Sequence, residues 1–135
     1  MAYTTIDDPS AYFHTQLYSG NGGTQSITND ANAGDFKPDF SWIKERSSTS
    51  NHILMDTTRG TSSALFSSLT NAESSTGNFI TSFDTDGFTL GNNGGLNQSS
   101  QTYVNWQWKA NGGTTSSNTD GSITSTVQAN TTAGF

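Results

Sequence analysis

The chain has no cysteine, and only 2 of its 135 residues are proline. Without cysteine it forms no disulfide bond and has no thiolate for catalysis or metal binding, so its stability must come from packing and backbone hydrogen bonds. It also has no apolar run long enough to span a bilayer, and its first residues lack the pattern of a signal peptide. We therefore expect no membrane insertion, and synthesis in a cytoplasm.

Positive charge is scarce too. The 5 Lys and Arg face 11 Asp and Glu, which gives a net charge of −6 and a pI near 4.4. Binding to a nucleic-acid backbone needs clustered cations, so we expect no nucleic-acid partner. Only 30% of the residues are hydrophobic, but the 8 Phe, 4 Tyr and 3 Trp are more than a disordered chain usually carries.

The large apolar residues are concentrated in four short segments, separated by spacers rich in Ser, Thr, Asn and Gly. These segments are residues 40–46, 52–60, 82–91 and 103–109. Short segments of this kind, bounded by turn residues and without an amphipathic helix between them, predict β-strands. The predicted fold class is all-β: an antiparallel sandwich of jelly-roll or concanavalin-like type.

The clearest alternation lies in residues 101–109. Val104, Trp106 and Trp108 share one face of the predicted strand, whereas Tyr103, Asn105, Gln107 and Lys109 share the other. We expect the apolar face to pack inside the sandwich. The predicted core residues are Trp42, Ile43, Leu54, Phe83, Phe88 and Trp106.

Two turn signals predict hairpins. Asp86-Gly87 lies between two apolar runs, and the glycine-rich residues 20–23 lie between predicted strands at 12–19 and 24–28. Residues 62–69 are compatible with one helical turn or with a short strand.

Composition divides the chain into three parts. Residues 1–110 are expected to form one β-sandwich module, and residues 111–121 a linker of Gly, Ser, Thr and Asn. Residues 122–135 alternate again and are expected to begin a following module or to form a connecting strand.

Motifs with known chemistry are weak. Asp84-x-Asp86-Gly87 lacks the further ligands and closing Glu of a calcium loop, so a hairpin turn is favoured, although a calcium site built from distant loops stays open. The two histidines, His14 and His52, have no second metal ligand nearby in the sequence. We expect no catalytic residue, no metal and no cofactor, and we predict that the protein is not an enzyme.

Aromatic residues offer one candidate for binding. Trp rings stack on sugar rings, although Trp at alternate strand positions more often belongs to the core. Trp108 lies nearest the end of its predicted strand and is the best candidate. Trp108, Tyr103 and Arg59 are therefore the candidate contacts for a glycan or a protein partner.

The amino-acid sequences of the four segments and their order along the chain resemble those of a known family. They read KPDFSWIKER (37–46), HILMDTTRG (52–60), TSFDTDGFTLG (81–91) and YVNWQWKA (103–110). In this order they resemble a concanavalin-like module of tail-fibre-like virion proteins from marine tailed phages, mostly cyanophages. Residues 1–10 resemble the start of such proteins, and residues 120–135 resemble the bridge into the next repeat.

The resemblance implies a non-enzymatic virion protein: the N-terminal module of a tail fibre or appendage, which attaches to the particle and positions host-contacting parts. It implies other tail or capsid proteins as partners, a homo-oligomer such as a trimer, and a host surface glycan as a further ligand. The expected location is the phage particle. A capsid decoration protein and a glycan-binding, lectin-like module are the alternatives, and a polysaccharide depolymerase is a more distant one.

Overall fold

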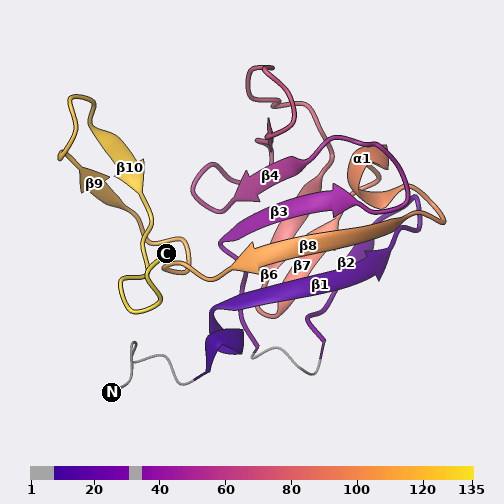
Figure 1. The fold of residues 1–135 in the computed structure, drawn as a ribbon, viewed down its shortest axis with the longest axis horizontal. Coiled ribbons are helices and arrows are strands. Elements are labelled where there is room, and N and C mark those ends of the chain that lie inside the picture. Colours follow the sequence, from indigo (N-terminus) through magenta and orange to yellow (C-terminus); the bar gives the residue numbers. More distant parts are fainter. Residues whose placement is uncertain (1–7, 31–34) are drawn as a thin grey trace.

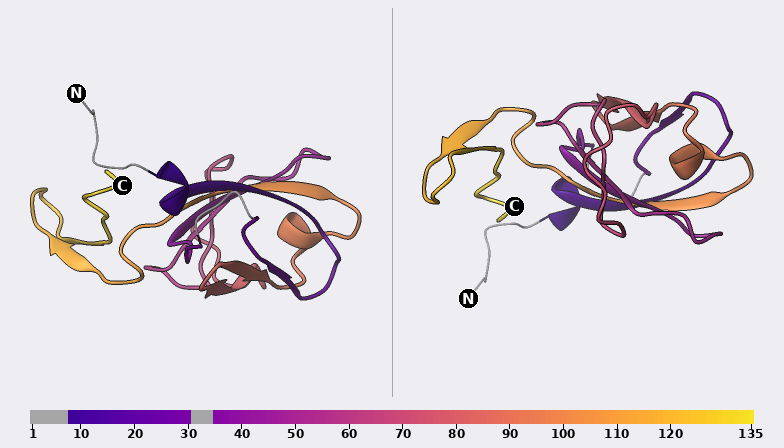
Figure 2. Two further views of the ribbon diagram at one scale, coloured as in Figure 1. Left: turned by 90° about the horizontal axis from the view of Figure 1, so that it is seen from below. Right: turned by 90° about the horizontal axis from the view of Figure 1, so that it is seen from above.

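The computed structural model describes residues 8–30 and 35–135. A five-stranded and a three-stranded antiparallel sheet lie face to face, and a separate two-stranded hairpin follows them (Figures 1 and 2). The predicted all-β antiparallel fold is thus confirmed. Residues 1–7, which carry part of the family resemblance, lie outside the described residues.

The larger sheet has the strand order β1-β8-β3-β4-β5. Its strands are β1 (Phe13–Ser19), β8 (Thr102–Trp108), β3 (Phe40–Glu45), β4 (Ile53–Asp56) and β5 (Leu65–Phe66). The strands predicted in segments 40–46, 52–60 and 101–109 are therefore β3, β4 and β8. Residues 62–69, for which two structures were open, contain the short strand β5. A 3-10 helix, Pro9–Ala11, precedes β1.

The smaller sheet has the order β2-β7-β6. Its strands are β2 (Gln25–Ile27), β6 (Ile80–Asp84) and β7 (Gly87–Leu90). Strands β6 and β7 form the predicted hairpin, with Asp84 opposite Gly87. Gly87 has φ +106°, and a Cβ there would lie 2.1 Å from the carbonyl oxygen of Ile27. Only glycine fits this turn without strain.

The hairpin predicted between residues 12–19 and 24–28 is wrong. β1 pairs with β8, and β2 pairs with β7 in the other sheet. Asn97, at the end of the short helix α1 (Gly94–Asn97), holds the turn between them. Its Oδ1 accepts a hydrogen bond from Asn21 N at 2.9 Å, and its carbonyl accepts one from Gly22 N at 2.8 Å. The glycine-rich turn therefore carries the chain from one sheet to the other.

The apolar core lies between the two sheets. Its buried members are Tyr18, Ile27, Ile43, Ile53, Met55, Ala64, Phe79, Ile80, Phe88, Leu90, Leu96 and Tyr103. The list includes Ile43 and Phe88, as predicted, and Phe83 packs against it while half-buried. The rings of Tyr18 and Tyr103 stack with their centroids 5.0 Å apart.

The two faces of β8 are the reverse of the prediction. Tyr103, Asn105 and Gln107 are 0% exposed and point into the sandwich. Trp106 therefore lies on the outer face, together with its register partner Trp42 and with Leu54, which is the register partner of Trp42. All three were predicted to be core residues, but they are half-buried on the opposite side of the sheet.

Polar side chains can occupy the interior because they bond one another there. Gln107 Nε2 donates to Asn29 Oδ1, and Asn105 Nδ2 donates to Ser41 Oγ at 3.3 Å. Paired amides carry a much smaller burial penalty than unpaired ones. The alternation thus separates two faces of the strand correctly but does not determine which face is inside.

The remaining strands, β9 (Ser116–Asn118) and β10 (Ser125–Val127), form a hairpin of their own. It stands clear of both sheets at the end where β8 leaves the sandwich (Figures 1 and 2). Strand β9 falls within the predicted linker, residues 111–121. The division of the chain at residues 110 and 121 stays a prediction.

Candidate binding surface on the outer sheet face

Large apolar side chains share the outer face of the five-stranded sheet. We call them the aromatic face, which consists of Phe13, Leu17, Val104, Trp106, Trp108, Phe40, Trp42, Leu54 and Leu65. Among these, Leu17 is 53% exposed and Phe13 38% exposed. The smaller sheet covers the opposite face only (Figure 2).

The rings on this face brace one another. Trp108 lies 4.9 Å from Phe13 and 5.3 Å from Phe40, measured between ring centroids. Trp42 and Trp106 meet edge to face at 5.7 Å. Contacts of this geometry are favourable beyond the area that they bury. The three Trp and Phe40 lie on the inner strands β8 and β3, which are paired on both sides, so these rings form a fixed platform.

The end of the chain returns to this platform. The Phe135 ring stacks on Trp108 at 5.6 Å with an interplanar angle of 19° and lies 6.0 Å from Phe40. Asn130 closes the last turn, since its Oδ1 accepts from Ala133 N at 3.0 Å and its Nδ2 donates to the Ala110 carbonyl at 3.2 Å. The ring of Phe135 therefore covers one side of the Trp108 ring.

Two pockets flank Phe135. The first has a volume of about 290 Å³, and its lining includes Phe40, Asp56, Arg59, Gln128 and Phe135. The second has a volume of about 330 Å³ and is lined by Pro9, Tyr12, Phe13, Trp108 and residues 133–135. The first combines aromatic rings with polar groups, whereas the second is mainly apolar.

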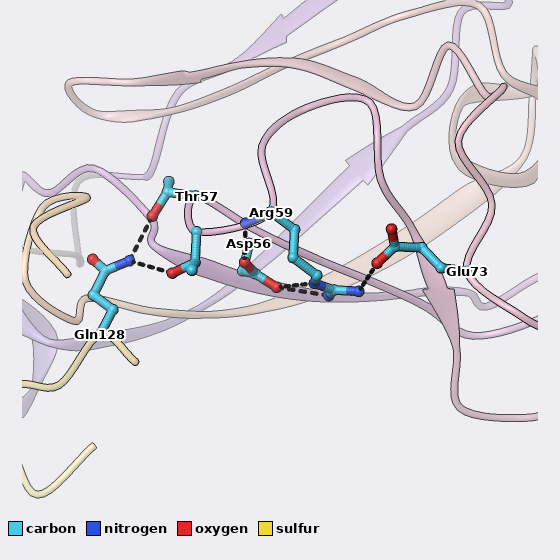
Figure 3. A network of polar contacts seen from close by, with 6 residues as sticks. Asp56, Thr57, Arg59, Glu73 and Gln128 are labelled. Carbon is cyan, nitrogen blue, oxygen red and sulfur yellow. Dashed lines mark hydrogen bonds and ion pairs between the residues drawn. The ribbon is translucent and has the colours of Figure 1, made fainter. Parts of the chain in front are cut away.

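The polar wall of the first pocket is fixed by a network (Figure 3). Arg59 donates from Nε and Nη2 to Asp56 Oδ2 at 2.7 and 2.6 Å, and from Nη1 to Glu73 at 3.1 Å. Gln128 donates from Nε2 to Thr57 Oγ1 at 2.9 Å. The guanidinium and the amide are therefore oriented before any ligand arrives.

Buried Asp39 ties the C-terminal part of the chain to the sheet. Its Oδ2 accepts from Ala110 N and Gly112 N, each at 2.8 Å, and its Oδ1 accepts from Thr57 Oγ1 at 3.0 Å. Asp39 is only 1% exposed. It fixes the point from which the C-terminal hairpin leaves the sandwich.

The structure separates the three predicted contact residues. Trp108 lies on the aromatic face, and Arg59 lines the adjoining pocket. Tyr103 is 0% exposed, so it is a core residue and not part of a contact surface. Its hydroxyl accepts from Gln98 N at 3.0 Å and donates to the Gly94 carbonyl at 3.2 Å. Burial raises the pKa of Tyr103 and, well above its usual value, that of Tyr18.

Sequence reasoning missed the rest of the surface. Nothing in the sequence of the strand predicted at residues 12–19 indicates that the face with Phe13 and Leu17 is exposed. Gln128 and Phe135 lie far from Trp108 in the sequence, so only the return of the chain brings them there.

Asp84 serves the hairpin, because its carboxylate accepts from Ser82 Oγ at 2.5 Å and from Thr89 Oγ1 at 2.7 Å. Within residues 8–30 and 35–135, no group of three or more His, Cys, Asp or Glu is placed to hold a metal ion. No helix in the described part of the chain has the length and apolar character needed to cross a membrane.

A family model described as Domain of unknown function (DUF7483) matches residues 8–135. The chain belongs to this family. The matched part of this DUF7483 chain takes in both sheets, the aromatic face and the C-terminal hairpin. No curated protein and no solved structure matches the chain.

Proposed function

We propose that this chain is a non-enzymatic structural module of a tailed-phage particle, part of a tail fibre or similar appendage. The proposed mechanism is attachment to another virion protein through the aromatic face, which positions the rest of the appendage for contact with the host. The resemblance of segments 37–46, 52–60, 81–91 and 103–110 to marine phage modules supports the setting. The aromatic face supports the mechanism.

The observation that carries the mechanism is the position of the three Trp, all on the outer face of one sheet. The chain is only 30% hydrophobic, so placing its largest apolar side chains outside leaves its interior partly polar. Large exposed apolar patches on soluble proteins mark interaction sites. Aromatic residues are enriched in protein–protein interfaces, usually inside a polar rim.

The rim of the face fits such a partner. Lys44 shares the face at the Leu17 end, and Asp56 and Arg59 lie at the Phe40 end. Charged groups at a rim set orientation, while the rings at the centre contribute most of the binding energy. The partner would present an apolar surface bordered by hydrogen-bonding groups.

Glycan binding is the second candidate, because the first pocket places the Arg59 guanidinium and the Gln128 amide beside the rings of Phe40 and Phe135. A sugar presents a face that stacks on a ring and an edge of hydroxyl groups for polar side chains. A lectin-like module would use this pocket, and the protein-attachment module would use the whole face.

Location in a particle tests the setting. Phage particles that encode the chain should be labelled at the tail or its fibres by a gold-conjugated antibody against residues 8–135. If the label is spread over the capsid lattice and the copy number matches the lattice positions, the chain is a capsid decoration protein and not part of a fibre. Absence of the chain from purified particles, measured by mass spectrometry, would overturn the proposal.

A matched pair of variants tests the mechanism. Trp106→Ser removes a ring at the centre of the aromatic face, and Leu69→Ser removes an apolar side chain that is 41% exposed and does not belong to that face. We expect Trp106→Ser to reduce incorporation into particles at least about tenfold, the effect of losing a central interface ring. Leu69→Ser should incorporate normally. Equal incorporation of both folded variants would contradict attachment through this face.

A glycan array separates the second candidate from the first. If the pocket binds sugar, the purified chain should give a signal that Arg59→Gln abolishes. Arg46→Gln, a change at an exposed position outside the pocket, should leave it intact. An array without signal at high avidity would exclude glycan binding by this pocket. It would leave the proposed attachment to a virion protein unaffected.

A further inference from the structure

The sandwich ends laterally at four strands, β1 and β5 in the larger sheet and β2 and β6 in the smaller. Edge strands present unpaired backbone groups, and proteins usually blunt them by shortness, charge or a bulge. β5 has 2 residues and β2 has 3. β6 has a register shift between Ile80 and Ser82 and ends in Asp84.

Strand β1 has none of these devices. It runs for 7 residues in unbroken register, from Phe13 opposite Trp108 to Ser19 opposite Thr102. Its sequence, FHTQLYS, contains no Pro, Asp, Glu, Lys or Arg. No strand of the described residues pairs with its other side. It is the long, regular and uncharged edge of the molecule.

The backbone groups at this edge belong to the residues that also carry the exposed side chains. Lys109 N donates to the Tyr12 carbonyl and Gly20 N donates to the Gln101 carbonyl, so the even-numbered positions bond to β8. Phe13, Thr15 and Leu17 therefore direct their N–H and C=O groups away from the sheet. Only some acceptors are engaged, as at Leu17, whose carbonyl accepts from Gln16 Nε2 at 2.8 Å. A carbonyl oxygen with one such bond still has a lone pair for a second donor.

We propose that two copies of this chain pair through β1, antiparallel, about a two-fold axis at Thr15. Phe13 of each copy then lies opposite Leu17 of the partner subunit, and the two Thr15 residues lie opposite each other. All of these side chains are on the outer face. The two five-stranded sheets become one continuous sheet of ten strands, and the two aromatic faces become one surface.

A second copy fits this edge better than an unrelated strand for two reasons. The register is self-complementary, because it places an aromatic ring against a leucine twice and a threonine against a threonine once. The chain carries a net charge of −6, so two copies repel over most of their surfaces, and β1 is a place where no carboxylate of the paired strands opposes another. On the inner side, His14 lies 3.6 Å from Asp30 and gives that carboxylate a partner in each copy.

The absence of cysteine makes the register directly measurable. In the proposed dimer the Thr15 Cα atoms are about 5.5 Å apart, within the range of a disulfide. The Ser19 Cα atoms, on the same edge and face, are about 27 Å apart. Under mild oxidation Thr15→Cys should form a covalent dimer at least about tenfold faster than Ser19→Cys, because a disulfide needs a short Cα separation. Equal rates would overturn the proposal.

Solution mass gives a second, independent reading. Light scattering should give twice the 14.3 kDa chain mass for the wild-type protein. Leu17→Lys should be monomeric, whereas Leu69→Lys, at another exposed leucine, should stay dimeric, with circular dichroism to confirm that both fold. A wild-type monomer at about 100 µM, a mass of three copies, or a dimeric Leu17→Lys would each refute pairing through β1. The contact is independent of the proposed function, so particle labelling can succeed while this proposal fails.

Discussion

Along strand β8, the inner and outer faces of the five-stranded sheet differ in the opposite sense from most sandwiches, because amides are buried on the inner face and Trp rings lie on the outer one. A sheet with one solvated face usually buries its apolar residues and exposes its polar ones. Here the inner face of β8 carries Asn105 and Gln107, both 0% exposed, and the outer face carries Trp106 and Trp108. The comparison shows that hydrogen bonds between distant side chains, such as that from Gln107 to Asn29, allow amides to be buried while rings lie outside.

Each face has its own means of stability. The inner face combines an apolar cluster, which includes Tyr103 and Met55, with amides that bond to Asn29 and Ser41. The outer face relies on ring-to-ring contacts and leaves much of its area open. Loss of an inner side chain should therefore affect the whole fold, whereas loss of an outer one should affect mainly what binds there.

The largest effect is expected at Tyr103 on the inner face. Tyr103→Ala removes a fully buried ring together with its stack on Tyr18 and should lower the free energy of unfolding by about 3–5 kcal/mol. Urea denaturation measures it. A loss below about 1 kcal/mol would mean that Tyr103 is exposed, and would contradict the assignment of Tyr103 to the buried face of β8.

The next largest loss of stability is expected at Asp39, which links the sheet to the C-terminal arm, residues 110–135. Asp39→Ala leaves the N–H groups of Ala110 and Gly112 without their acceptor and should cost about 2–3 kcal/mol. Because the arm carries Phe135 onto Trp108, the Trp fluorescence should also shift to longer wavelength before the main unfolding transition. Unchanged hydrogen exchange at these two amides would contradict this role.

A smaller effect on stability is expected at the outer face. Trp108→Ala removes a half-buried ring and should cost about 1–2 kcal/mol, well below Tyr103→Ala on the same strand. Denaturation of both variants under one set of conditions gives the comparison. Equal losses would show that the two faces are equally buried.

The smallest effect is a pH dependence of the inner face. Burial raises the pKa of Tyr18 well above 10.0, and Tyr103 adds to this through its charge. The folded state keeps a proton that the unfolded chain releases, so stability is complete below pH 10 and falls as pH rises from there through the folded pKa. Tyr18→Phe should shrink the loss of stability between pH 9 and pH 11, measured by urea unfolding. A loss equal to that of the wild type would contradict the burial of this phenol.

The sequence predicted the strands better than their arrangement. Alternation in residues 101–109 and the Asp-Gly signal at residues 86–87 depend on local chemistry, so β8 and the β6–β7 hairpin were found. The turn at residues 20–23 looked like a hairpin because its glycines suit one. Its true role depends on Asn97, which lies far away in the sequence.

The candidate surface was predictable only in part. Trp108 and Arg59 were predicted as candidate contacts, and in the structure each lines one of two neighbouring pockets. The inward position of Gln107 depends on Asn29, and that of Asn105 depends on Ser41. Pairings between distant residues of this kind leave no local pattern, so Trp42 and Trp106 were assigned to the wrong side.

Cysteine labelling of adjacent positions in β8 tests the central claim most directly. Because the chain has no cysteine, Trp106→Cys and Gln107→Cys each introduce a single thiol on one face of the strand. In the folded protein the thiol of Trp106→Cys should react with a water-soluble disulfide reagent at least about 100-fold faster than that of Gln107→Cys, which reacts only on opening of the sheet. Fast labelling at 107 with protection at 106 would contradict the account, because it would place the aromatic face inside the sandwich.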